Sequence, residues 1–186
     1  RGSLVHTDPL GNDLDQHDRA RVYLFASSQH FAAPNDGPQH GVYRHPTNPL
    51  NTSFLLRALL DALDAWATTG TLPPESRVPT RAGETAVTAA VAKNLFPKIP
   101  DVSCPGAPNR LYVQDHGPDF HRGVFSKEPP EEDDSREYAV LVPKVDADGN
   151  DIPGIRTPHV EVPLATFTGW NFRREGSGDK AMAGVI

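Results

Sequence analysis

The sequence predicts an α/β fold, and three stretches support that class. Arg21–His30 (RVYLFASSQH) has the apolar run of a buried strand, followed by a turn of small polar residues and a histidine. Asn51–Thr69 is the one long helical pattern, and Tyr138–Arg173 contains two runs rich in β-forming residues. A strand, a loop and a packing helix in succession are common in α/β proteins.

Composition limits the size of the fold. The chain has 186 residues, a hydrophobic fraction of 37%, 19 prolines and 15 glycines. This length favours one domain, but the low apolar content and the many chain-breaking residues favour long ordered loops or a segment of a larger fold. We expect a segment, because one helix and a few strands do not close a two-layer core.

Charge and cysteine content exclude several classes of partner and site. The net charge is −6 and the Lys and Arg residues are scattered, which argues against a nucleic-acid partner. No run approaches 18 apolar residues, so no membrane span is predicted. The single cysteine, Cys104, excludes an internal disulfide and an all-cysteine zinc site. It has no adjacent base, which favours a structural thiol over a nucleophile.

His30 is the candidate for chemistry at the end of the predicted strand. A serine hydrolase with an α/β fold needs a histidine on a loop leaving the last strand, where the imidazole reaches a nucleophile held elsewhere. The alternative is a histidine that only forms a hydrogen bond at a strand end. Asp8 and Asp13 precede it and are either candidate orienting acids or parts of a solvated acidic loop.

Asn51–Thr69 carries a broad apolar stripe between start and stop signals. Asn51 or Ser53 can cap its beginning, Gly70 can end it, and the prolines that follow prevent its continuation. A stripe of this width predicts a helix that packs on a core. The stripe consists of Leu55, Leu56, Leu59, Leu60, Ala62, Leu63 and Trp66.

The stretch from residue 71 to residue 130 offers fewer signals. A short helix is predicted over Glu84–Asn94, ended by Pro97. Four candidate metal ligands follow, but they lack the His-x-x-x-His spacing of a helix and are interrupted by Gly-Pro, so a surface loop is favoured over a zinc site. These four residues are Asp115, His116, Asp119 and His121. The acidic stretch Lys127–Glu137 is predicted to be a solvated linker or a mobile loop.

Tyr138–Arg173 predicts a β hairpin. Its two β-rich runs, YAVLVPKV and HVEVPLATFTGW, are separated by Asp-Gly and Pro-Gly turn signals. Asp146–Asp151 resembles the start of a calcium loop, but its glycine falls two positions early and the twelfth residue is Thr157 rather than glutamate. We therefore expect a turn there and not a metal site.

Four stretches together resemble the C-terminal part of a bacterial α/β-hydrolase family whose members are poorly characterised. They are RVYLFASSQH, LLRALLDALDAWATTGTLPPESRVP, FPKIPDV and YAVLVPKVDADGNDIPGIRTPHVEVPLATFTGWNFR. The resemblance runs from residue 1 to about residue 184 and is most specific in VLVPKVDADGN and TFTGWNFR. It implies the last core strand, histidine loop and terminal helix of an α/β-hydrolase fold in residues 1–70. A loop-rich insert would follow in 71–137, and a β hairpin and tail of the same domain in 138–186.

The resemblance also implies an activity, which is ester hydrolysis by a serine nucleophile with no metal and no cofactor. The general base of such proteins maps onto His30. The nucleophile and the acid are expected upstream of Arg1, because the chain contains no G-x-S-x-G sequence and no counterpart of the family's glutamate. The implied partners are a small-molecule ester and the remaining N-terminal part of the same enzyme. The 186-residue segment alone is predicted to be inactive.

Residues close to His30 in the sequence are candidates for the substrate pocket of this hydrolase. The first candidates are Gln29, Phe31 and Tyr43, with His40 and His45 beside them.

Two other functions remain open. The first is a non-catalytic ligand-binding or interaction module that presents Trp170, Tyr138 and Phe167, although such large aromatic residues are often core residues. The second is a metal-dependent hydrolase that uses His116, His121 and an aspartate.

Overall fold

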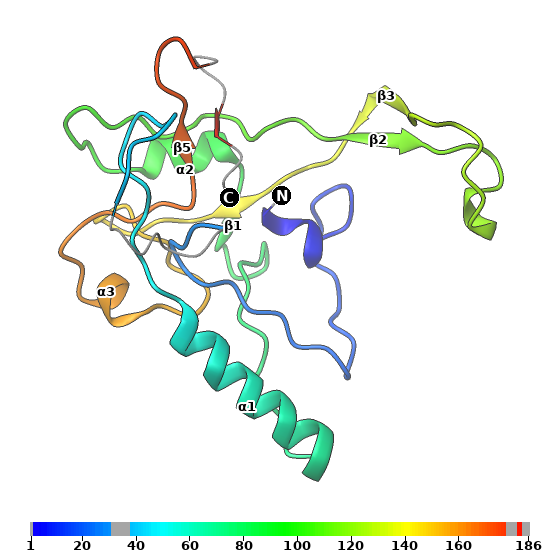
Figure 1. Cartoon of the computed structure of the whole chain (residues 1–186), viewed down its shortest axis with the longest axis horizontal. Coiled ribbons are helices and arrows are strands. Elements are labelled where there is room, and N and C mark those ends of the chain that lie inside the picture. Colours follow the sequence, from blue (N-terminus) through cyan, green and yellow to red (C-terminus); the bar gives the residue numbers. More distant parts are fainter. Residues whose placement is uncertain (1, 31–37, 178–181, 184–186) are drawn as a thin grey trace.

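The computed structural model describes residues 2–30, 38–177 and 182–183, which form short elements joined by long loops (Figure 1). The helices are η1 (Gly2–Val5), α1 (Ser53–Thr69), α2 (Ala89–Leu95), η2 (Phe120–Arg122) and α3 (Pro158–Glu161), of which η1 and η2 are 3₁₀ turns. The strands are β1 (Ala86–Val87), β2 (Tyr112–Asp115), β3 (Glu131–Glu137), β4 (Val142–Pro143), β5 (Asn171–Phe172) and β6 (Met182–Ala183).

The strands form three separate two-stranded antiparallel sheets, β1–β4, β2–β3 and β5–β6. The described residues thus combine helices with small antiparallel sheets and contain no extended parallel sheet. In Figure 1 the β2–β3 pair extends to the upper right, away from β1, β5 and α3, and α1 projects toward the bottom of the view.

The segment predicted as the last core strand is extended but is not a strand of a sheet, which corrects that prediction. Tyr23 forms a parallel bridge with Arg77, and Phe25 forms a parallel bridge with Ile155. The N–H of Leu24 donates to the carbonyl of Arg77 and the N–H of Ala26 donates to the carbonyl of Ile155, so the segment has two short neighbours in succession. Parallel pairing therefore begins with each neighbour but stops after a single bridge.

One glycine allows the neighbour that contains Ile155 to come this close. Gly154 has φ +95°, and a Cβ atom placed on it would lie 2.5 Å from the carbonyl oxygen of Leu24. A side chain at this position would separate the two backbones, so the parallel bridge at Phe25 depends on the glycine.

Helix α1 confirms the predicted helix within two residues at its start. The Asn51 side chain accepts the backbone N–H of Ser53, and Gly70, with φ +75°, ends the helix by donating its N–H to the carbonyl of Trp66. The expected packing is only partial, because every residue of α1 keeps at least some exposed surface. Leu56, Leu60 and Leu63 are 57%, 64% and 54% exposed.

The predicted hairpin within Tyr138–Arg173 is wrong. Strand β4, from the first run, pairs with β1 instead, and part of the second run forms the short helix α3. The sequence Thr157-Pro158 explains why a helix begins here, because proline is favoured in the first helical turn. The helix places Val160 in the core, where it is fully buried.

The acidic stretch Lys127–Glu137, expected as a solvated loop, contains β3. Two ion pairs offset part of the negative charge here. Lys127 pairs with Asp115 at 2.5 Å, and Arg110, which precedes β2, pairs with Glu137 at 2.9 Å. Exposed ion pairs of this kind, next to the two strands, contribute modestly beside a strand whose described side chains are mostly exposed.

The buried core is small and is supplemented by buried polar groups. Its main cluster is Ala26, Leu50 and Val160, with Phe167 packed against it. Buried polar residues include Ser27, Asn150 and Thr157, so hydrogen bonds between loops contribute much of the internal order. Among the described residues, no helix is long and apolar enough to cross a membrane.

Candidate functional site

The candidate site begins where the extended segment at residues 22–26 turns toward His30. Ser27 is buried and has φ +57°, an uncommon conformation for a residue with a side chain, and it reverses the chain direction directly after the core residue Ala26. His30 lies at the end of this turn and is exposed. The predicted pocket residue Phe31 lies outside the described residues.

Ser27 and Asp151 hold this turn by two reciprocal hydrogen bonds. The backbone N–H of Ser27 donates to Oδ2 of Asp151 at 2.6 Å, and the backbone N–H of Asp151 donates to Oγ of Ser27 at 2.7 Å. The carbonyl of Ser27 accepts from Nδ2 of Asn48 at 2.7 Å. Ser27 therefore links the histidine turn to the loop at Asp151, and its hydroxyl oxygen accepts a hydrogen bond from a backbone N–H.

The carboxyl group of Asp151 is enclosed by protein, and this burial raises its pKa to about 6. The hydrogen bond from Ser27 and the positive charge of Arg156 act in the opposite direction but do not outweigh the loss of hydration. The carboxyl group next to the histidine turn thus changes protonation near neutral pH.

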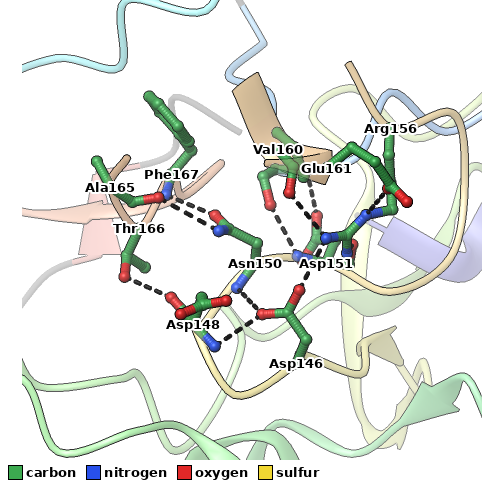
Figure 2. A network of polar contacts seen from close by, with 11 residues as sticks. Asp146, Asp148, Asn150, Asp151, Arg156, Val160, Glu161, Ala165, Thr166 and Phe167 are labelled. Atoms are coloured by element: carbon green, nitrogen blue, oxygen red, sulfur yellow. Dashed lines mark hydrogen bonds and ion pairs between the residues drawn. The ribbon is translucent and has the colours of Figure 1, made fainter. Parts of the chain in front are cut away.

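Arg156 organises the loop that carries Asp151 (Figure 2). Its guanidinium donates to Oδ2 of Asp146 and to Oε2 of Glu161, each at 2.8 Å, and to the carbonyls of Asp151 and Val160. Partial burial raises the pKa of Asp146, but the hydrogen bonds from Arg156 and from two backbone N–H groups outweigh it and hold that pKa below its usual value. The turn predicted over Asp146–Asp151 is confirmed, and Arg156 pairs with its first carboxylate, that of Asp146.

Asn150 links this turn to the segment around Phe167. Its Oδ1 accepts the backbone N–H of Phe167 at 2.7 Å, and its Nδ2 donates to the carbonyl of Ala165 (Figure 2). Asn150 is fully buried. The loop at 146–151 therefore joins the histidine turn on one side to the TFTGW segment on the other.

The TFTGW segment also touches the histidine turn directly. A Cβ atom on Gly169 would lie 2.7 Å from the carbonyl oxygen of Ser28, so only glycine fits there without a shift of the backbone. Asn48 donates to the carbonyls of both Ser27 and Thr168, which closes the same contact from a third segment.

A cavity of about 550 Å³ lies beside these contacts. Gln29 and Tyr43, both predicted as pocket residues, line it, and so does His45. His30 follows Gln29 directly in the chain but is not among the lining residues, and His40 lines a separate hollow with Arg44 and Arg173. The lining residues are Gln29, Pro38, Tyr43, His45, Pro46, Thr47, Asn48, Pro49, Ile99, Val102, Ala165, Thr166, Phe167, Thr168, Gly169, Trp170 and Asn171.

Aromatic and polar side chains give the cavity its character. Trp170 makes edge-on contacts with Phe96 and Phe172, with ring centroids 5.8 Å and 5.9 Å apart. Asn171 fixes the backbone of His45 by donating to its carbonyl and accepting its N–H. Burial lowers the pKa of His45, and the positive charges of Arg44 and His40 lower it further, so its imidazole is neutral at pH 7.

Asp8 and Asp13, the candidate orienting acids, both bind backbone N–H groups of loops. The carboxylate of Asp8 accepts the backbone N–H groups of Leu10 and Asn12, and that of Asp13 accepts the N–H groups of Arg81 and Ala82. Both acids thereby shape loops. Burial raises the pKa of the Cys104 thiol to about 11, which opposes a role as a nucleophile.

The four candidate metal ligands near β2 do not converge. Asp115 pairs with Lys127, His116 stacks on Phe120 at 4.6 Å, and Nδ1 of His121 lies 3.1 Å from the carbonyl of Pro118. Among the described residues, no group of three or more His, Cys, Asp or Glu side chains is arranged to hold a metal ion.

Sequence reasoning did not identify Asn48, Asn150, Asp151 or Arg156 as parts of this site. Asn48 and Asp151 act through hydrogen bonds to segments 120 or more positions away, Asn150 through a bond across 15 positions, and Arg156 through bonds within residues 146–161. The available signal was the density of Asp and Asn around residues 146–151, which indicates side chains that bond to nearby backbone. It does not indicate which distant segment they hold.

Comparison with known proteins gives one match. A family model described as "Alpha/beta hydrolase domain" matches residues 4–184. No curated protein and no solved structure matches the chain.

Proposed function

The chain belongs to the α/β hydrolase domain family, and on that premise we propose that it supplies the general-base histidine, His30, of a serine carboxylic-ester hydrolase. The substrate is a small-molecule ester. The nucleophilic serine and the acid are supplied by polypeptide outside these 186 residues, because the sequence holds no G-x-S-x-G.

The mechanism assigns one proton to His30. Its imidazole takes the hydroxyl proton as the serine oxygen attacks the ester carbonyl, and returns it to the alkoxide oxygen as the alcohol leaves. Water then enters, the same imidazole takes a proton from it as the water oxygen attacks the acyl carbon, and the imidazole gives that proton to the serine oxygen as the acid product leaves. The acid, which is supplied from outside these residues, orients the imidazole ring and stabilises the imidazolium that forms in each transition state.

The observation that carries the proposal is the position of the cavity relative to His30. Gln29, the residue directly before His30, lines the cavity, and neighbouring Cα atoms are about 3.8 Å apart. The turn that precedes both residues is held by Ser27, Asp151 and the close approach of Gly169 to Ser28. A fixed turn that carries an exposed histidine directly after a residue of the cavity wall suits a general base that acts on a bound ester.

Labelling with a fluorophosphonate probe tests the division of the catalytic groups. We expect no labelling of the 186-residue chain, and labelling of one serine outside residues 1–186 in a polypeptide that includes the preceding sequence. Stoichiometric labelling of Ser27 or Ser28 in the short chain would contradict the proposal, because the nucleophile would then lie inside it.

The cavity also favours a second candidate function, a non-catalytic ligand-binding module. Trp170 and Phe167, proposed as its aromatic contacts, both line the cavity, whereas Tyr138 is not among the lining residues. The two functions differ in one outcome: a binding module would not label with fluorophosphonate at any serine, with or without the preceding sequence.

A further inference from the structure

The walls of the cavity beside the histidine turn define what can occupy it. The described lining residues include Tyr43, Phe167, Trp170, Ile99 and Val102, and none of them is Asp, Glu, Lys or Arg. The polar side chains among them are amides and hydroxyls, together with His45, which is neutral at pH 7 because burial lowers its pKa.

From this lining we propose that the cavity binds the uncharged, bulky apolar part of the ester, aromatic or branched alkyl, and rejects groups that carry a charge. The inference rests on the proposed hydrolase function and adds the substrate class. A volume of about 550 Å³ lies within the range of small-molecule sites, so it accommodates far more than an acetyl group.

The rejection of charge follows from the cost of desolvation. A carboxylate or an ammonium group placed in the cavity loses water and finds no described side chain of opposite charge in the lining. Aromatic faces such as that of Trp170, fixed by its edge-on contacts with Phe96 and Phe172, instead favour flat apolar groups.

The adjacent hollow, unlike the cavity, is lined by charged side chains. It is lined by Arg44, Arg173 and Arg174, with Glu175, and it shares Tyr43 with the cavity. An anionic aromatic molecule has a competing place to bind there. The experiment must therefore report which of the two places is occupied.

Three naphthalene derivatives of similar size provide the probes: neutral 2-naphthyl methyl ketone, anionic 2-naphthoate and cationic 2-naphthylmethylammonium. The ketone is not hydrolysed, so binding is measured without a nucleophile. The protein has two tryptophans, and only Trp170 lines the cavity, whereas Trp66 lies on α1. Their indole N–H signals in a ¹H–¹⁵N NMR spectrum, assigned with Trp66→Phe, serve as reporter and control.

We expect the ketone to shift the Trp170 signal saturably and to leave the Trp66 signal in place. The two charged probes should bind at this reporter at least about tenfold more weakly. Equal or tighter binding of naphthoate at Trp170 would overturn the inference, and so would the absence of a saturable shift with the ketone.

Filling the cavity supplies a second test. Ala165→Phe projects from an exposed lining position and should reduce the ketone's affinity at least about tenfold, and Val102→Phe provides an independent filling variant. Ala58→Phe, on the exposed surface of α1, is the matched control and should bind as the parent does. Unchanged affinity in both folded filling variants would overturn the inference.

Failure of this inference is distinguishable from failure of the proposed function. If the ketone binds at Trp170 but no ester is hydrolysed by the longer polypeptide, the substrate pocket stands and the hydrolase function fails. If esters are hydrolysed and the ketone does not bind, the pocket assignment fails and the role of His30 stands.

Discussion

At the scale of single residues, the site depends on polar side chains that bind backbone groups of distant segments. Ser27 and Asp151 exchange two hydrogen bonds, and Asn48 and Asn150 each bind backbone groups of the segment at residues 165–168. Such buried bonds are costly to break, because the partner left behind is buried without a substitute. The turn that ends at His30 is therefore held by a few residues, each of which can be changed separately.

Asp151 gives this turn a stability that varies with pH. Because burial raises its pKa from an ordinary 3.8 to about 6, the folded protein binds a proton there more tightly than the unfolded chain does. The contribution of the protonated form to the free energy of unfolding is complete below about pH 4 and is lost as the pH rises through 6.

Asp151→Asn should remove this pH dependence, because the amide keeps an acceptor for the N–H of Ser27 and carries no charge. We expect the variant to be more stable than the parent at pH 7.5 and to lose that advantage at pH 4.5, by urea unfolding at both values. Asp151→Ala, which also removes the charge but lacks the acceptor, should be less stable than Asp151→Asn by about 1–3 kcal/mol at pH 7.5. An advantage of the asparagine variant that is the same at both pH values would contradict the assignment.

Gly169 can be tested in the same way at the contact with the histidine turn. Gly169→Ala places a Cβ atom 2.7 Å from the carbonyl oxygen of Ser28, so the backbone must shift, and we expect a loss of about 1–3 kcal/mol in the free energy of unfolding. Gly106→Ala is the matched control, since its Cβ would meet only the flexible end of Lys93. Equal small effects from both substitutions would show that the contact is not tight.

At the scale of elements, local signals explain α1, whereas strand pairing depends on distant residues. The helix follows from an uninterrupted periodic run with Gly70 after it, features that lie within the run itself. Strand β4 could have paired with any edge. It pairs with the two-residue strand β1 far back in the chain, and no local pattern specifies that choice.

Helix α1 shows that an apolar periodicity does not determine how much of a helix is buried. Its apolar stripe is broader than the face that contacts the rest of the chain: Trp66 packs under Arg21 at 5.3 Å, whereas Leu60 is 64% exposed. The amphipathic pattern predicts a helix correctly but does not state how much of its apolar surface is covered.

Leu59→Gln and Leu60→Gln form a matched pair on adjacent positions of α1. Leu59 is half-buried and Leu60 is exposed. In the 186-residue chain, we expect Leu59→Gln to lower the free energy of unfolding by about 1 kcal/mol or more, and Leu60→Gln to change it by less than about 0.5 kcal/mol. Thermal or urea unfolding measures both. A larger loss for Leu60→Gln would mean that the exposed leucine face is covered in solution.

At the scale of the whole molecule, the sequence predicted the family better than it predicted the architecture, and the site residues stay a prediction. RVYLFASSQH and TFTGWNFR pointed to an α/β hydrolase, and the structure brings Gln29, Tyr43 and Trp170 to one cavity. The predicted central strand and hairpin failed because both require partners supplied by long-range contacts, and the core, centred on Ala26, Leu50 and Val160, is small.

The role of His30 is the claim on which the functional account depends, and catalysis by the polypeptide that includes the preceding sequence tests it most directly. We compare the steady-state hydrolysis of a neutral aryl ester by the parent, by His30→Ala and by His159→Ala, an exposed histidine on α3 that serves as control. We predict that kcat falls at least about 10³-fold for His30→Ala, with KM nearly unchanged, and that the control behaves as the parent does. A kcat for His30→Ala within a few-fold of the parent would contradict the account.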